Sequence, residues 1–308
     1  MARDAGKGPF AATPVVIVAL VVFVLVDTAL VWWALASVGR NAGSPAAETM
    51  PTLPARETAA ADSTVPATTM PAAATAAVVP SARYLYAVDG ATAFRGTRGS
   101  CPSVGASFES TTDGGATWAT GATEFTDARA VAQAPEDPIV VIARDAATCA
   151  VTAYWTFVGG IDWEPAAEFQ PTWIADGGRA IAPGGLATTP CRDGVADLAG
   201  RNDSEAVVLC EDGLLLTTAD AGVTWVAVDP VADAVAVAAG TDAFLVAVAG
   251  SPDCDGVRVI AAGGGAIGEC VAVAVAPGET AIDVAGDGTV WVWAGDAIAR
   301  SADGGATW

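Results

Sequence analysis

The distribution of hydrophobic and polar positions divides the chain into three parts. A continuous apolar run extends from Val15 to Ala36 and contains one charged side chain, Asp27. As an α-helix, this run would be about 33 Å long, which is enough to cross a bilayer. After residue 82 the apolar residues instead occur in short alternating runs, such as 207–210 and 290–293, and this pattern predicts β-strands. The sequence therefore predicts one membrane helix and an all-β domain, with a polar segment between them.

Flanking charges predict the orientation of the membrane helix. Arg3 and Lys7 precede the apolar run, and only Arg40 follows it closely. Because positive residues are retained on the cytoplasmic side, we expect a cytoplasmic tail over residues 1–14 and a transmembrane helix over 15–38. The rest of the chain would then lie outside the cell membrane, which it crosses once.

A cleavable signal peptide is the alternative interpretation of this segment. Ala34 and Ala36 could form a small-residue cleavage site, but the apolar run is longer than a typical signal-peptide core. We therefore favour an uncleaved anchor. Asp27 could be a functional intramembrane carboxylate or a tolerated, protonated acid, and the sequence leaves both readings open.

Residues 39–82 consist mainly of Ala, Pro, Thr and Ser and contain no aromatic residue. Such a segment cannot bury enough apolar surface to offset the entropy of ordering it. We therefore predict a disordered linker between the anchor and an ectodomain over residues 83–308.

An octapeptide repeats in the ectodomain. It reads TTDGGATW at 111–118, TADAGVTW at 218–225 and SADGGATW at 301–308, and a degenerate copy, TFVGGIDW, occupies 156–163. The terminal tryptophans are 45, 62 and 83 residues apart. A period near 42 residues, with a long insertion before Trp225 and an eroded copy near 263–267, is typical of β-propeller blades.

Dividing the ectodomain by this period predicts about five blades. Eight Asp-Gly pairs, which favour tight hairpin turns, support the all-β assignment, and Val140–Ile142 and Val271–Val275 are further strand candidates. The last blade would be closed by an N-terminal strand such as Tyr84–Val88 or would be left short.

Each residue type in the octapeptide suits a hairpin turn. The Asp can accept hydrogen bonds from its own turn, the second Gly permits a positive φ, and the Trp can fill the space between neighbouring sheets. These structural roles are predicted for Asp113, Gly115, Thr117, Trp118, Asp220, Gly222, Thr224, Trp225, Asp303, Gly305, Thr307, Trp308 and, in the degenerate copy, Trp163.

The octapeptide resembles the Asp-box, or BNR repeat, of sialidases, sortilin-type receptors and photosystem II assembly factors of the YCF48 type. The resemblance covers residues 83–308 and implies a β-propeller whose Asp-boxes lie on the rim, away from the central ligand face. Asp113, Asp220 and Asp303 would then be structural rather than catalytic.

Sialidase activity would require further residues. Those enzymes use an arginine triad, a tyrosine nucleophile late in the chain and a Phe/Tyr-Arg-Ile-Pro motif. Here Phe94-Arg95 retains only two motif residues, and the tyrosines are Tyr84, Tyr86 and Tyr154. We therefore expect Arg95 to be a solvated loop residue and the ectodomain to be non-catalytic.

Composition excludes several other functions. The chain has no histidine and a net charge of −21, so His-based catalysis and nucleic-acid binding are both disfavoured. Residues 263–268 match GxGxxG, but a strand-like alternation follows them instead of the helix that a dinucleotide site needs. The acidic turns at 211–213 and 253–256 lack calcium-loop spacing. We therefore predict no cofactor and no metal.

The six cysteines all lie in the ectodomain and could form 15 sets of three disulfides. Proximity in sequence favours Cys191–Cys210 and Cys254–Cys270, which leaves Cys101–Cys149. Reactive thiols are the alternative, although no cationic residue near them in sequence would lower their pKa.

The sequence therefore predicts a single-pass membrane protein whose propeller binds or scaffolds an extracytoplasmic protein or a glycan. A glycoside hydrolase and an assembly factor for a membrane complex are the alternatives.

Overall fold

The structure, a computed structural model, describes residues 77–133, 138–166, 172–265 and 268–308. These residues form β-strands connected by turns and loops. The predicted membrane helix at 15–38 lies outside them. Within the described ranges, no helix is long and apolar enough to span a membrane.

The described strands form six antiparallel sheets, and each sheet is made from consecutive strands. Sheets 1 and 2 contain β1 (Arg83–Ala87), β2 (Ala93–Thr97), β3 (Glu109–Thr111) and β4 (Ala119–Thr120), then β5 (Phe125–Gln133), β6 (Ile139–Asp145), β7 (Val151–Thr156) and β8 (Glu164–Pro165). Sheets 3 and 4 contain β9 (Ile174–Asp176), β10 (Arg179–Ile181) and β11 (Ala187–Thr188), then β12 (Val195–Gly200), β13 (Ala206–Cys210), β14 (Leu215–Thr218) and β15 (Val226–Ala227). Sheets 5 and 6 contain β16 (Ala234–Ala239), β17 (Phe244–Ala249) and β18 (Val257–Ala261), then β19 (Thr280–Val284), β20 (Val290–Ala294) and β21 (Ala297–Ser301).

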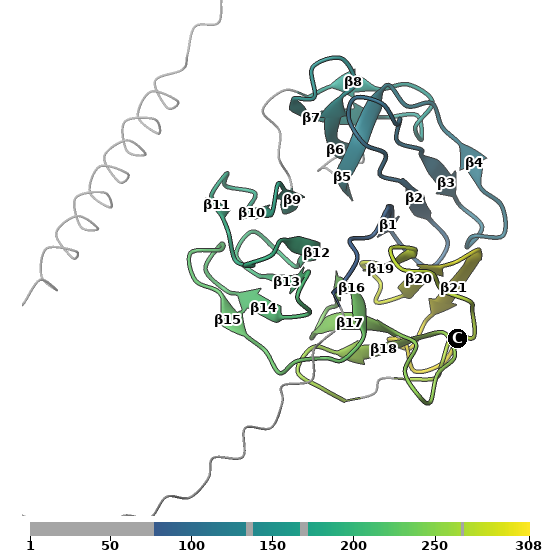
Figure 1. The fold of residues 1–308 in the computed structure, drawn as a ribbon. Coiled ribbons are helices and arrows are strands. Elements are labelled where there is room, and N and C mark those ends of the chain that lie inside the picture. The colour runs from purple at the N-terminus through teal and green to yellow at the C-terminus, as the bar shows by residue number, and fades with distance from the viewer. Residues whose placement is uncertain (1–76, 134–137, 167–171, 266–267) are drawn as a thin grey trace, which may run out of the picture. The chain divides into compact units, whose positions relative to one another are not determined.

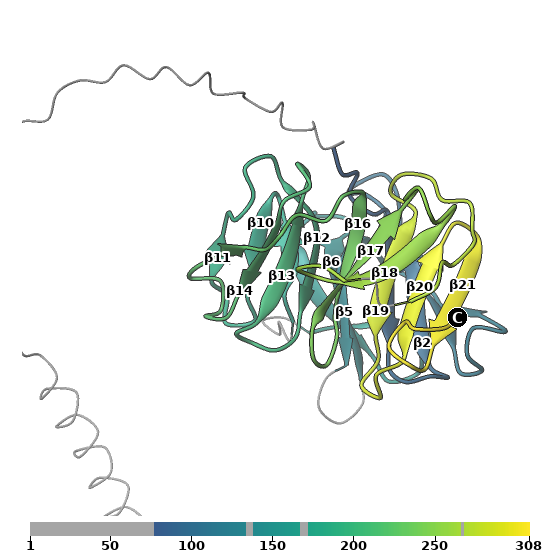
Figure 2. The same cartoon turned by 90° about the horizontal axis from the view of Figure 1, so that it is seen from below.

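The sheets are arranged as the blades of a β-propeller. The first strand of each sheet is innermost, and the inner strands contact one another around the ring in the order β1, β5, β9, β12, β16 and β19, with β19 returning to β1 (Figure 1). Seen from the side, the strands run from one face of the ring towards the other (Figure 2). The all-β prediction is confirmed, but the described residues contain six sheets rather than about five. The additional one is sheet 3, which folds from the segment interpreted as an insertion before Trp225 and has no octapeptide.

Apolar residues fill each interface between adjacent sheets. Phe108, Phe125 and Trp163 pack between sheets 1 and 2, where Trp163 makes edge-to-face contacts with both phenylalanines. Trp291 is buried between sheets 6 and 1, and Trp173 is buried between sheets 3 and 4. Smaller Val, Leu, Ala and Ile side chains make up most of the other interfaces. The hydrophobic core therefore consists of layers between adjacent sheets, and the inner strands surround the central axis.

The ring closes between sheets 6 and 1 without a shared strand. β1 is the inner strand of sheet 1, so sheet 6 has three strands in the described part of the chain, which is the short-blade alternative. The Ala87 backbone N–H donates to Asp283 at 2.7 Å, and the Trp291 indole N–H donates to the Asp89 carbonyl at 3.0 Å. Hydrogen bonds made by side chains therefore stabilise this seam.

Two segments differ from the predictions. Val271–Val275 forms no strand in the described residues; Val271 alone exchanges two backbone hydrogen bonds with Val257, the first residue of β18. Residues 77–82, placed in the linker from composition, contact the propeller. The backbone N–H of Val78 donates to the Glu211 carbonyl at 2.7 Å, and that of Ala82 donates to Gly278 at 2.9 Å.

Candidate functional site

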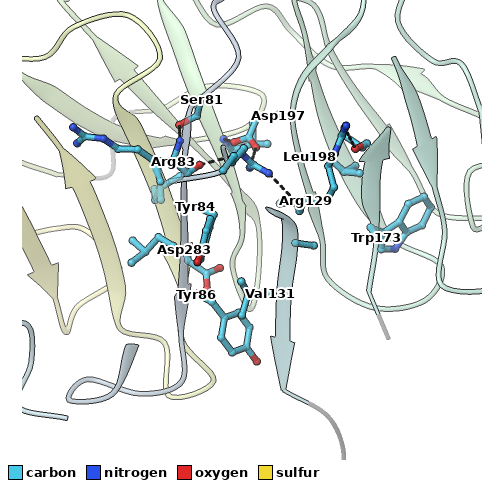
Figure 3. Close-up of a pocket in the computed structure, with 18 of the residues that line it drawn as sticks. Ser81, Arg83, Tyr84, Tyr86, Arg129, Val131, Trp173, Asp197, Leu198 and Asp283 are labelled. Atoms are coloured by element: carbon cyan, nitrogen blue, oxygen red, sulfur yellow. Dashed lines mark hydrogen bonds and ion pairs between the residues drawn. The ribbon is translucent and has the colours of Figure 1, made fainter. Parts of the chain in front are cut away.

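A cavity of about 330 Å³ lies among the inner strands at the centre of the ring. Its walls include residues from all six inner strands. Figure 3 shows part of this lining and labels residues of β1, β5, β12 and β19. Three arginines and three aspartates line it: Arg83, Arg98, Arg129, Asp127, Asp197 and Asp283. The cavity therefore collects both signs of charge in a domain that is strongly acidic overall.

On one side of the cavity, charged residues join sheets 2 and 3. Arg129 on β5 contacts Asp127 at 2.5 Å and Asp176 at 3.3 Å, and Arg144 on β6 contacts the same two carboxylates at 3.1 and 2.5 Å. The Arg129 guanidinium also donates to the Ala175 carbonyl. Because partly buried carboxylates need paired charges, we interpret this cluster as a link between blades.

Arg98 and Asp197 form a second charged pair. The Arg98 guanidinium donates to the backbone carbonyls of Arg83, Ala128 and Arg129 and lies 4.0 Å from the Asp197 carboxylate on β12. Asp197 also accepts the Val237 N–H of sheet 5 at 2.9 Å. Burial raises the pKa of Asp197, and the Arg98 charge opposes that rise.

Asp283 on β19 differs from the other lining carboxylates. It accepts the Ala87 N–H, but no arginine pairs with it in the described ranges. Burial raises the pKa of Asp283 from 3.8 to about 7. Nearby, burial and the Asp283 charge raise the pKa of Tyr86, and the buried Thr280 hydroxyl has no hydrogen-bond partner in the part of the chain that the structure describes. Asp283 and Thr280 both line the cavity, so unused hydrogen-bonding capacity remains there.

Asp197 and Asp283 were not predicted as site residues, although the sequence carries a signal for both. Both begin the pattern D-x-A-G, at 197–200 and 283–286. The structure places both patterns at the end of an inner strand, where each carboxylate accepts a backbone N–H from the inner strand of the next sheet. The repeat therefore marks contacts between blades at the axis.

The three intact octapeptides form nearly identical turns outside the cavity. In the first, the Thr117 N–H and hydroxyl donate to Asp113 at 2.9 and 2.6 Å, and the Thr111 hydroxyl accepts the Gly115 N–H at 2.9 Å. The copies around Asp220 and Asp303 repeat these bonds. Hydrogen bonds to the carboxylate, the Thr117 hydroxyl first, lower the pKa of Asp113 to about 2.

The octapeptide tryptophans contact the preceding sheet or its connection. Trp163, Trp225 and Trp308 donate their indole N–H to Ala122, Thr188 and Glu269 respectively. Trp118 packs in the cluster that includes Trp291 of sheet 6. None of these turn residues lines the central cavity, so the structure gives them positions consistent with a structural role.

Arg95 is not the solvated loop residue that we expected. It lies on β2, pairs with Glu109 at 2.7 Å and places its guanidinium 4.0 Å from the Trp118 ring centroid. β2 begins at Ala93, so Arg95 lies within a strand, and its guanidinium also lies 4.8 Å from the Trp293 ring centroid of sheet 6.

The cysteines form three disulfides: Cys101–Cys149, Cys191–Cys210 and Cys254–Cys270. These are the pairings that proximity in sequence favoured. Cys101 and Cys149 lie in the connections between the second and third strands of sheets 1 and 2, so this bond joins two neighbouring blades. The other two bonds each close a loop of fewer than 20 residues.

No family model matches the chain, and no curated protein sequence is similar to it at a significant level. Among solved structures, YCF48 bound to a D1 peptide is 15% identical over 74% of this chain, with a TM-score of 0.26, and this chain covers 64% of that protein's length. YCF48 from Cyanidioschyzon merolae is 14% identical, covering 76% of this chain and 84% of that chain, with a TM-score of 0.39. An Aleuria aurantia lectin is 10% identical, covering 75% and 98%, with a TM-score of 0.43. At this level of similarity we transfer no ligand or role from these proteins.

Proposed function

We propose that this protein is a membrane-anchored, extracytoplasmic binding module without catalytic activity, and that its central cavity receives a cationic amine from its partner. The observation that carries the proposal is Asp283, a carboxylate in the cavity with no basic partner in the described ranges. The anchor is supported by the apolar sequence at 15–38, and the orientation by the charges on either side of it.

An amine would satisfy the groups that the cavity leaves unpaired. A partly buried carboxylate without a counter-charge is costly, and a ligand ammonium would offset that cost. The Tyr86 ring lies beside Asp283 (Figure 3) and can contribute a cation–π contact. A cavity of about 330 Å³ is large enough for an amine-bearing side chain such as that of lysine.

The hydrolase alternative has less support. A tyrosine nucleophile must lose its proton, yet burial raises the pKa of Tyr84, Tyr86 and Tyr154. The Tyr84 hydroxyl also donates a hydrogen bond to the Ser107 carbonyl. An assembly factor remains compatible with the proposal, because it differs from a general binding module only in the identity of its partner.

The test compares two small probes on the full chain in detergent micelles. N-acetyl-lysine amide carries the ammonium, and N-acetyl-norleucine amide has the same alkyl chain without it. We expect saturation-transfer NMR to detect the lysine probe at pH 8, and the signal to fall when the pH is lowered to 5, where Asp283 is protonated. Asp283→Asn should abolish the signal while leaving the melting temperature at least as high. Equal signals from both probes, or an unchanged signal in the variant, would contradict the proposal.

A further inference from the structure

The degenerate octapeptide at 156–163 exposes three large apolar side chains. Phe157 is 68% exposed, Val158 51% and Ile161 74%. They lie within five residues of each other at the tip of the turn between β7 and β8. A cluster of this kind differs from the single exposed apolar residues that are normal on protein surfaces.

The turn itself does not need these side chains. The Thr156 hydroxyl accepts the Gly160 N–H at 2.9 Å, as the first residue does in the intact copies, and Trp163 remains buried between sheets 1 and 2. The intact turn at 111–118 forms the same structure with Thr112, Asp113 and Ala116 in the equivalent positions. The Phe157 ring lies 6.1 Å from the Trp155 ring, but the turn does not explain why this copy carries exposed Phe, Val and Ile side chains.

Acidic groups border the apolar tip. Asp162 and Glu164 are exposed beside it, and Glu124 is exposed two residues after Ala122, whose N–H donates to the Gly160 carbonyl. The segments 99–128 and 145–178 contain no Lys or Arg. An anionic bilayer would repel such a surface, whereas a protein with basic residues around an apolar pocket would complement it.

We infer that residues 157–161, the apolar tip, insert into an apolar pocket with a basic rim on a partner protein. Phe157 is the anchor, because a rigid aromatic ring gives the largest contact area for the least lost conformational freedom. The interaction surface is separate from the central cavity and does not depend on what the cavity binds.

The test introduces the photo-cross-linking residue p-benzoylphenylalanine into the full-length protein in the cells that produce it. One variant carries it in place of Phe157, and the matched control carries it in place of Thr112, the exposed equivalent in an intact turn. We expect one discrete protein adduct from position 157 and none from position 112. The cross-linked partner peptide should be apolar with Lys or Arg close to it, and the yield should fall as salt concentration rises.

A second variant removes the apolar tip without changing the turn. Phe157→Thr, Val158→Asp, Ile161→Ala and Asp162→Thr together reproduce the sequence of residues 111–118. This variant should keep the wild-type melting temperature. With the photo-cross-linking residue at position 164, it should give at least about tenfold less adduct than a protein that carries the same residue at 164 and the native turn. The inference is overturned by a lipid adduct, by an adduct with a second copy of this chain, by equal yields at positions 157 and 112, or by no adduct.

Discussion

Replacing Asp283 by Asn removes a charge that the folded protein accommodates at a cost. Below pH 3.8 the carboxyl is neutral in both the folded and the unfolded chain. As the pH rises, the unfolded chain loses this proton first, while the folded chain keeps it until pH about 7. The free energy of unfolding therefore falls as the pH rises between these two values, and this group causes no further loss at higher pH. The difference of about three between the pKa values of the folded and unfolded chains corresponds to about 4 kcal/mol in the free energy of unfolding.

Asn has the size of Asp and can still accept the Ala87 N–H. Asp283→Asn should therefore match the wild type near pH 4 and exceed its free energy of unfolding by about 4 kcal/mol at pH 8. Urea denaturation followed by tryptophan fluorescence from pH 4 to 8.5 measures the difference. Asp287→Asn is the matched control, because turn hydrogen bonds, that from Thr289 first, lower the pKa of Asp287, so its loss should bring no gain at pH 8. A difference between Asp283→Asn and wild type that does not change with pH would refute the reasoning.

Three further predictions concern packing, disulfides and anchoring. Trp163→Ala should lower the free energy of unfolding by about 3–5 kcal/mol in urea titrations. Trp225 is more exposed, so Trp225→Ala should cost less. Equal losses would contradict the packing of Trp163 between sheets 1 and 2. Denatured, unreduced protein should titrate with no free thiol, and replacing Cys254 and Cys270 by Ser should cost about 3 kcal/mol; a stoichiometric thiol would contradict the pairing. A chain with residues 1–40 replaced by a cleavable signal should be recovered in the soluble fraction, and recovery in the membrane fraction would contradict the anchor.

The octapeptides made most of the fold predictable. Their bonds are local, so the sequence of each copy specifies its turn, and the spacing of the tryptophans locates four of the sheets. Sheet 3 was missed because β9–β11 are two or three residues long and no octapeptide follows them. Val271–Val275 alternates like a strand, but alternation cannot show whether a hydrogen-bonding partner is available.

The central cavity was much less predictable. Asp197 and Asp283 are ordinary acids in an acidic sequence, and their significance arises only when the ring brings six inner strands to one axis. The D-x-A-G repeat could have identified them as equivalent positions. It could not have shown that Asp197 lies near an arginine and Asp283 does not, because that difference depends on which sheets are neighbours across the axis.

The absence of a shared strand at the seam between sheets 6 and 1 has a consequence for how the protein folds. Each sheet is built from consecutive strands, so it can assemble from nearby sequence, and local contacts form quickly. The meeting of β19 with β1 joins the last sheet to the first, and the bond between Asp283 and Ala87 spans 196 residues. Closing a loop of that length costs about 5 kcal/mol of chain entropy. The seam should therefore be the last part of the ring to form, and before it closes the domain should be an open arc with five assembled interfaces between sheets. In the native protein, the amide hydrogens at the seam should be the first to exchange.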